Sequence, residues 1–193
     1  MRFAPILFAA SVCAACMPSS PPPAPVTAAA ADELAVLALV VDSVLADADE
    51  RFVVIADSTS NSHMDAEQLA NFFPATDPAS RGEMVRDFLA KNGAGGAVPS
   101  AIPAGAVIRM FPLREIFGGS DDFSARWAEF HRRYAPARGY HTLSRPGFDA
   151  PRRRAVVATG TVCGGRCGHG EVVLLERVGT GWRIAGRRRT WIS

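Results

Sequence analysis

Residues Arg152 to Ser193 read RRRAVVATGTVCGGRCGHGEVVLLERVGTGWRIAGRRRTWIS. Three runs rich in apolar and β-branched residues are separated here by short glycine-rich segments, a pattern that predicts three β-strands. The runs are Arg154 to Val162, Glu171 to Val178 and Gly181 to Ile192. Because both connections are short, we expect an antiparallel meander with the second run as its middle strand.

Two independent constraints predict the register of this meander. A two-residue turn at Gly179-Thr180 predicts three cross-strand pairs: Leu175 with Ile184, Glu176 with Arg183, and Glu171 with Arg188. A disulfide between Cys163 and Cys167 requires Cα atoms about 4.4 to 6.8 Å apart. That pairing places Arg154 opposite Glu176. Both constraints therefore set Glu176 between two arginines, and each such pair of opposite charges contributes about 0.2 to 1 kcal/mol.

The same registers gather polar side chains on one face of the sheet, near the cysteine-containing turn. Side chains alternate between faces along a strand, so a shift of one residue would disperse the group. Its members are Thr159, Thr161, Cys163, Cys167, His169, Glu171 and Arg188. This group is the candidate site, with His169 as a base and Glu171 or Arg188 as an orienting or anion-binding residue. The ordinary structural interpretation is a solvated row of charges.

The two cysteines of the turn admit three interpretations. A structural disulfide that closes so short a loop contributes about 2 kcal/mol in the chain-entropy model. Zinc binding would use Cys163, Cys167 and His169, but these residues do not complete a four-ligand site, so we expect no metal. A redox role would need an exposed thiolate, which Arg166 and His169 could favour, yet the spacing differs from thioredoxin-like motifs. We expect the structural disulfide and no cofactor.

The composition indicates one globular domain with an uneven distribution of charge. The chain has 193 residues, of which 48% are hydrophobic, enough to bury a core. Asp32 to Phe123 contains 15 acidic and 6 basic residues, whereas Ser124 to Ser193 contains 4 acidic and 14 basic ones. A basic surface for nucleic acid or anionic lipid is one interpretation. The arginines are dispersed without an aromatic-interleaved module, so we expect the two halves to attract each other and predict no nucleic-acid partner.

The first residues have the pattern of an export signal. Met1 to Cys16 carries a positive charge, an apolar run and small residues, and it is shorter than the roughly 20 apolar residues that span a bilayer. It resembles a bacterial lipoprotein signal, which implies a lipid anchor on Cys16. Ordinary signal cleavage, without a lipid, is the alternative. Met17 to Ala31 is rich in proline and alanine and is expected to be a disordered tether, which leaves 32–193 as the domain.

Upstream of the meander, hydrophobic periodicity predicts three helices and three strands. They are expected at Asp32 to Asp47, Ser80 to Asn92 and Asp121 to Tyr134, and at Phe52 to Ala56, Ala106 to Phe111 and Tyr140 to Ser144. Ser80 and Glu83 form a capping-box pattern at the start of the second helix. The sequence therefore predicts an α+β fold, in which N-terminal helices pack on a mainly antiparallel, curved sheet that ends in the meander.

Five other residues are weaker site candidates. The polar loop after the first predicted strand contains Asp57, Thr59 and His63, and a loop at the end of a buried strand is a frequent place for chemistry. His131 and His141 have side chains that titrate near neutral pH. We expect structural roles for all five.

Four short patterns stand in the C-terminal part of the chain. They are Trp127-x2-Phe130-x3-Tyr134, Leu143-Ser144-Arg145-x-Gly147-Phe148, Cys163-x3-Cys167-x2-Gly170 and Trp191-Ile192-Ser193. On these residues the chain resembles a family of uncharacterised bacterial exported proteins, and the resemblance implies no particular activity. The order of helix and sheet also resembles cystatin-like and nuclear-transport-factor-like folds, which host both enzymes and binding modules.

These observations predict an exported, lipid-anchored protein of the cell envelope, located in the periplasm or else secreted. It is expected to be a binding or structural module with a disulfide-clamped hairpin. The membrane is the expected partner through Cys16, together with an unidentified protein or small-molecule ligand. The alternative is an enzyme or ligand-binding pocket that uses His169, Glu171 and Arg188. A pocket lined by these three residues would favour the alternative.

Overall fold

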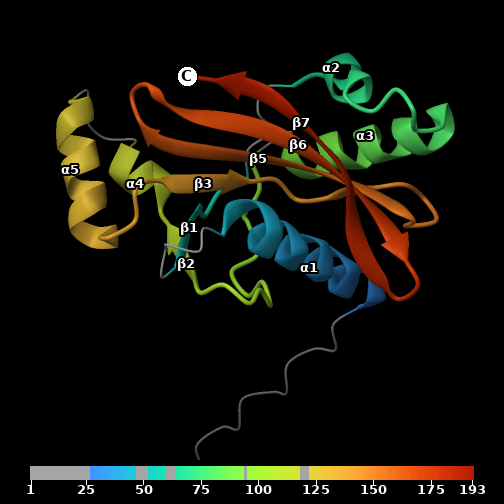
Figure 1. Ribbon diagram of the computed structural model, residues 1–193, viewed down its shortest axis with the longest axis horizontal. Helices are drawn as coiled ribbons and strands as arrows, with labels where there is room; N and C mark the ends of the chain where they lie inside the picture. Colours follow the sequence, from blue (N-terminus) through green and yellow to red (C-terminus); the bar gives the residue numbers. More distant parts are fainter. Residues whose placement is uncertain (1–26, 47–51, 60–63, 94, 118–121) are drawn as a thin grey trace, which may run out of the picture.

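A seven-stranded mixed sheet forms the centre of the protein (Figure 1). The computed structural model describes residues 27–46, 52–59, 64–93, 95–117 and 122–193, so the expected signal (1–16) and most of the expected tether lie outside them. The strands follow the order β2-β1-β3-β5-β6-β7, and a short β4 pairs with β5. They are β1 (Val53–Ala56), β2 (Ile108–Phe111), β3 (Tyr140–Leu143), β4 (Gly147–Phe148), β5 (Arg154–Gly164), β6 (Cys167–Val178) and β7 (Gly181–Ile192).

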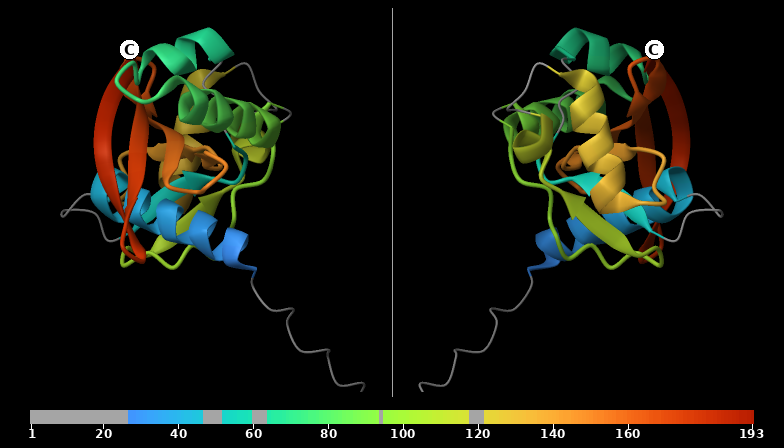
Figure 2. Two further views of the ribbon diagram at one scale, coloured as in Figure 1. Left: turned by 90° about the vertical axis from the view of Figure 1, so that its right-hand side faces the viewer. Right: turned by 90° about the vertical axis from the view of Figure 1, so that its left-hand side faces the viewer.

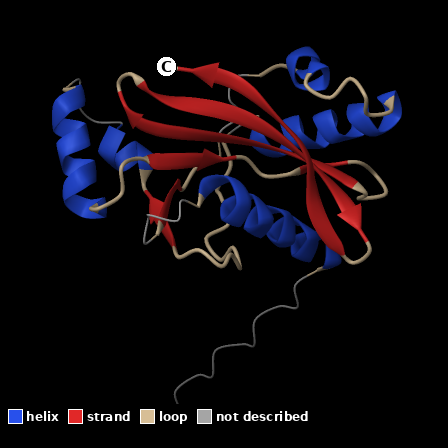
Figure 3. Ribbon diagram, viewed as in Figure 1, coloured by secondary structure: helices blue, strands red, loops and turns tan. Residues whose placement is uncertain are grey.

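Helices cover both faces of this sheet, so the expected α+β class is confirmed (Figure 3). They are α1 (Ala28–Val40), the π-helical turn η1 (Val41–Leu45), α2 (Ala66–Asn71), α3 (Pro78–Asn92), α4 (Leu113–Phe117) and α5 (Phe123–Tyr134). In the side views of Figure 2, α1 lies on one side of the strands, and α2 and α3 lie on the other. Among the described helices, none is long and apolar enough to cross a membrane.

Apolar side chains on the two faces of the sheet pack against different helices. Val36, Leu37 and Val40 of α1 are fully buried against one face, where they join Val157 and Val173 in a single cluster. The other face carries two clusters, one beneath α2 and α3 and one beneath α5. Helix α1 lies between the sheet and other buried segments. This position explains why it is apolar around much of its circumference.

The C-terminal meander has the predicted strand order. Leu175 pairs with Ile184, and Glu176 pairs with both Arg154 and Arg183. The disulfide is also confirmed: the Cα atoms of the two cysteines lie 5.1 Å apart, at the tip of the β5–β6 hairpin. The hairpin turns thus determined the register of the neighbouring residues, because few pairings are compatible with so short a connection.

One predicted pair in the meander is wrong. Glu171 lies opposite Arg189, not Arg188, because the register shifts between Leu174 and Leu175 and leaves Ala185 as an extra residue in β7. A β-bulge of this kind inserts one residue and moves every later side chain by one position. Arg188 consequently lies opposite Val172, on the face away from Glu171.

Two predicted helix starts also differ from the structure. Helix α1 begins at Ala28, where Thr27 Oγ1 accepts a hydrogen bond from the Ala30 amide, so residues 28–31 belong to the helix and not to the tether. Helix α3 begins at Pro78 with Asp77 as its N-cap, and the capping box expected at Ser80 is absent. Ser80 donates instead to Asp149, which is buried. A buried acceptor thus outweighs the local capping pattern.

Ion pairs between the two halves of the chain account for much of the charge asymmetry. Arg145 pairs with Glu33 at 2.6 Å, and Arg154 pairs with Asp77 at 2.7 Å. Asp32 lies between Arg152 and Arg177. Burial raises the pKa of Asp32, but hydrogen bonds from Arg177 and Arg152 lower it more, so the pKa falls below its usual value. The acidic N-terminal half is thus held to the basic C-terminal half.

Candidate functional site

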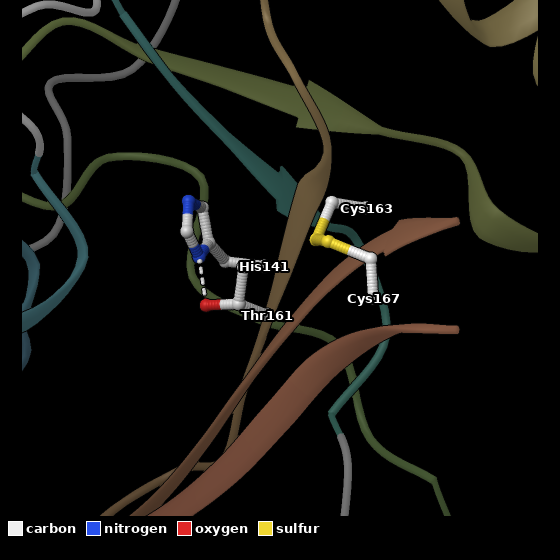
Figure 4. The surroundings of a disulfide bond; sticks show 4 residues. All are labelled: His141, Thr161, Cys163 and Cys167. Carbon is white, nitrogen blue, oxygen red and sulfur yellow. Dashed lines mark hydrogen bonds between the residues drawn. A yellow bond between two sulfur atoms is a disulfide. The ribbon is translucent and has the colours of Figure 1, made fainter. Parts of the chain in front are cut away.

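Two histidines and a threonine form one row across the sheet. His141 of β3 lies opposite Thr161 of β5, which lies opposite His169 of β6. The His141 Nδ1 atom is 3.0 Å from Thr161 Oγ1, and Figure 4 shows the two side chains turned toward each other beside the disulfide. The polar cluster therefore gains a member, His141, that the meander register alone does not include. We call His141, Thr161 and His169 the histidine row.

The histidine row contains an imidazole that stays neutral at physiological pH. Burial is the main cause that lowers the pKa of His141 to about 4, and the charge of the neighbouring His169 contributes in the same direction. Only 9% of the His141 surface is exposed. A general base works best when its pKa is near the working pH, so His141 is a weak base here. Its ring instead exchanges a hydrogen bond with a hydroxyl, which satisfies both groups in the interior.

A second polar row lies next to the first and is internally neutralised. Thr159 and Glu171 face each other across β5 and β6, and both are buried. Glu171 Oε2 accepts hydrogen bonds from Arg187 Nη2 at 2.6 Å and from Nε at 2.9 Å. The carboxylate is therefore paired with Arg187, whereas the expected partner Arg188 lies on the opposite face. The charge of this carboxylate is therefore balanced by Arg187, which disfavours a role in binding a cationic substrate.

The cysteines are adjacent to these rows but offer neither a metal ligand nor a thiolate. Cys163 and Cys167 are bonded to each other, so both sulfurs are consumed. Within the described part of the chain, no group of three or more His, Cys, Asp and Glu side chains is placed to hold a metal ion. The hairpin tip is thus a closed structural clamp.

The loop after β1 contains weaker site candidates, and the contacts of its described residues are structural. Asp57 Oδ1 accepts a hydrogen bond from the Leu113 amide at 3.3 Å and so joins the ends of β1 and β2. Thr59 is buried, and its hydroxyl has no hydrogen-bond partner among the described residues. His63 lies outside those residues. His131 packs its ring against Trp127 and Phe130 of the same helix.

Two clefts lined largely by charged residues lie on either side of the β4–β5 connection. Their volumes are about 470 and 630 Å³, and Glu83 and Asp149 line both. Asp149 is only 3% exposed, and it accepts hydrogen bonds from Ser80 Oγ and from the amides of Arg153 and Arg154. Its hydrogen-bonding capacity is used by the loop, which indicates a structural role.

Arg152 in the same connection adopts φ of 52°, in the left-handed region that non-glycine residues rarely occupy. This conformation places its guanidinium 3.7 Å from the centre of the Phe148 ring and within hydrogen-bonding distance of Asp32. The strained backbone thus connects the loop to the start of α1. Neither His169 nor Glu171 lines these two clefts, nor the two clefts near α2, whose volumes are about 480 and 230 Å³.

Sequence reasoning missed two members of the candidate site, and for different reasons. His141 reaches the row through pairing of β3 with β5, across an intervening segment whose length does not fix the register. Arg187 replaces Arg188 because of the bulge at Ala185. A glycine directly after Ala185 was the one available signal, since glycine within a strand often marks a bulge.

No protein family, curated protein or solved structure gives a significant match to this chain.

Proposed function

We propose that the chain is an exported, lipid-anchored protein of the cell envelope whose domain binds a partner. The observation that carries the proposal is the Cys163–Cys167 disulfide. Disulfides form and persist outside the cytoplasm, where thiols are not kept reduced. The first 16 residues have the pattern of a lipoprotein export signal that ends at Cys16. Two separate parts of the sequence thus support the same compartment.

Binding is favoured over catalysis by the state of the polar side chains. The alternative, a small-molecule enzyme, relied on His169, Glu171 and Arg188 acting together. Arg188 projects from the opposite face, and Glu171 is neutralised by Arg187. His141 is neutral and hydrogen-bonded. None of the four clefts described above is lined by His169 or Glu171, whereas catalysis requires a cleft that brings a substrate to the reacting groups.

The anchor also fits the place where the domain begins. Helix α1 starts at Ala28, so a short segment separates Cys16 from the folded part. That segment contains several prolines, which favour extended conformations. A lipid on Cys16 would therefore hold the domain near the membrane without burying any of its surface. One lipid chain binds a membrane only weakly, whereas two or more give a stable anchor.

The experiment that tests this proposal measures the acylation of Cys16 in the full-length protein. The protein is expressed in a bacterial host supplied with an alkyne-labelled fatty acid, and its N-terminal peptide is analysed by mass spectrometry. We expect Cys16 to be acylated and Cys16→Ser to abolish the label. Cys13→Ser is the matched control and should keep it. An unacylated mature protein in the soluble periplasmic fraction would support ordinary cleavage and contradict the anchor.

The state of the disulfide tests the compartment separately. Protein from the envelope fraction is treated with a thiol-alkylating reagent before and after reduction. We expect Cys163 and Cys167 to react only after reduction. Free thiols in freshly isolated protein would contradict an oxidising location.

A further inference from the structure

Strand β7 is an open edge of the sheet. It runs for 12 residues and pairs with β6 on one side only (Figure 1). No described strand pairs with its other side. Strands rise about 3.3 Å per residue, so the edge is about 40 Å long. An edge strand presents a row of unpaired N–H and C=O groups, which are a template for another strand.

The charges along this edge fall into two groups. Arg183 and Arg187 are ion-paired with Glu176 and Glu171 of β6. Arg188 and Arg189 are exposed, and no ion pair to either is found among the described residues. The two point to opposite faces, because successive side chains of a strand alternate. A strand added to this edge would therefore meet one unpaired cation on each face of the sheet.

An apolar cleft lies next to the same part of the edge. Its volume is about 230 Å³, and it is formed by Phe72 and Phe73, before α3, with Leu174, Gly186 and Arg188. A methyl group added to the Gly186 Cα would meet no other atom within 4 Å, so the space beside this residue is open. The cleft thus offers an aromatic wall, an open strand backbone and an unpaired guanidinium side by side.

Two bulges limit the regular part of the edge. Ala185 and Thr190 are the extra residues at the two register shifts between β6 and β7. Between them, residues 186–189 pair in register with residues 171–174 of β6. Bulges twist a strand and interrupt its ladder, so an added strand can follow β7 over this short segment only.

Arginines on an edge strand also protect it from pairing with copies of itself. A second copy is disfavoured here, because antiparallel pairing centred on residues 186–189 would bring two arginine triplets together. An acidic strand meets the opposite condition, since the same cations attract it. The charge of the edge thus disfavours a second copy of this chain as the partner and favours an acidic strand.

We propose that an acidic extended segment of another protein adds to β7 at residues 186–189 as a further strand. Its acidic side chains pair with Arg188 and Arg189, and an apolar side chain enters the cleft beside Phe72 and Phe73. Main-chain hydrogen bonds give affinity in this mode of recognition, and side-chain pockets give specificity. The inference deepens the proposed binding function and names the chemistry of the partner.

A titration with synthetic peptides tests this inference on the full-length, disulfide-intact protein. The probe is the short peptide Val-Thr-Glu-Glu-Thr-Val, which in an extended strand presents one glutamate and one valine on each face. Binding is followed through the amide NMR signals of β7. We expect saturable shifts centred on residues 186–189. The same peptide with both glutamates replaced by lysine should not bind. The glutamate peptide with N-methylated amides should also fail, because it has lost its main-chain donors.

Matched variants locate the site. Arg188→Glu combined with Arg189→Glu should weaken binding about tenfold or more, since both unpaired cations are reversed. Arg153→Glu combined with Arg166→Glu makes the same change in net charge at exposed positions outside β7, and it should alter binding less than about twofold. Thermal unfolding of each variant confirms that it folds.

Several outcomes would overturn the inference. These are no binding of the glutamate peptide, equal binding of the N-methylated peptide, equal weakening by the two double variants, and a peptide-free dimer that forms through β7. Acylation of Cys16 is measured in a separate experiment. A failed titration with an acylated Cys16 would therefore contradict this inference and leave the envelope location standing.

Discussion

The two ends of the sheet are built in different ways. Strands β5 to β7 are long and antiparallel, and two short hairpins connect them. Strand β1 has four residues, all buried, and it pairs in parallel with β2 and β3. Parallel neighbours need long connections, and here the chain passes through two helices between β1 and β2. One end is thus determined by local turns, and the other by contacts between distant segments.

This difference appears in what holds each end together. The meander has cross-strand ion pairs and a disulfide, and much of β7 is exposed. The parallel end has an aromatic cluster in which Phe111 contacts four rings, including those of Phe130 and Tyr140. Burial of apolar surface is the larger contribution per residue. We therefore expect substitutions at the parallel end to cost more stability than those in the meander.

Removing the central aromatic ring of the parallel end should have the largest effect. Phe111→Ala deletes a fully buried side chain, and the expected loss is about 3 to 5 kcal/mol of unfolding free energy. Chemical denaturation followed by circular dichroism measures it. Phe123→Ala is the control, because that ring is 46% exposed and should cost less than about 1 kcal/mol. Similar losses for the two variants would remove the basis of the comparison.

Strand β3 joins the two ends of the sheet. Its histidine, His141, should give the next largest effect, a dependence of the unfolding free energy on pH. The pKa of His141 is about 4 in the folded protein and near 6.5 when unfolded. Between these values the unfolded chain binds more protons, so stability is complete above about pH 6.5 and falls as the pH drops toward 4. The two pKa values allow a decrease of up to about 3 kcal/mol.

Denaturation at several pH values checks this expectation. His141→Phe should flatten the dependence between about pH 6.5 and 4, whereas His131→Gln, on the exposed face of α5, should retain it. An unchanged pH dependence in His141→Phe would show that this imidazole is not buried in its neutral form.

The disulfide contributes less, because it closes a short loop. Cys163→Ser combined with Cys167→Ser should lower the unfolding free energy by about 2 kcal/mol. Reductant should lower the unfolding free energy of the wild-type protein by a similar amount and leave that of the double variant unchanged. Equal stability of wild type and double variant would mean that the hairpin turn forms without the clamp.

The contrast between the two ends explains which features the sequence could predict. The pairs Leu175–Ile184 and Glu176–Arg183 follow from one turn, so local chemistry was sufficient for them. The parallel pairing of β1 depends on contacts between segments far apart in the chain. The alternation of apolar residues in a strand does not distinguish parallel from antiparallel pairing. The same limit applies to the candidate site: Thr161 and His169 were predicted together, whereas His141 arrives from a strand outside the meander.

The two glutamates of β6 differ in burial, and this difference predicts which of them stabilises the meander more. Cross-strand position alone would make Glu176 the more important of the two, because it lies between Arg154 and Arg183 in the register. Arg154 pairs instead with Asp77, and the Glu176 side chain remains 32% exposed. Glu171 is only 11% exposed in its side chain and accepts two hydrogen bonds from Arg187. The order of importance is therefore reversed.

Glu171→Gln should cost about 1 to 2 kcal/mol, because the Glu171 side chain is buried and Arg187 would lose its charged partner there. Glu176→Gln should cost less than about 1 kcal/mol, as is usual for exposed pairs. A double-mutant cycle that combines Glu171→Gln with Arg187→Gln isolates the pair and should show a coupling of at least about 0.5 kcal/mol. A larger loss for Glu176→Gln than for Glu171→Gln would show that cross-strand position, and not burial, determines which charges stabilise the meander.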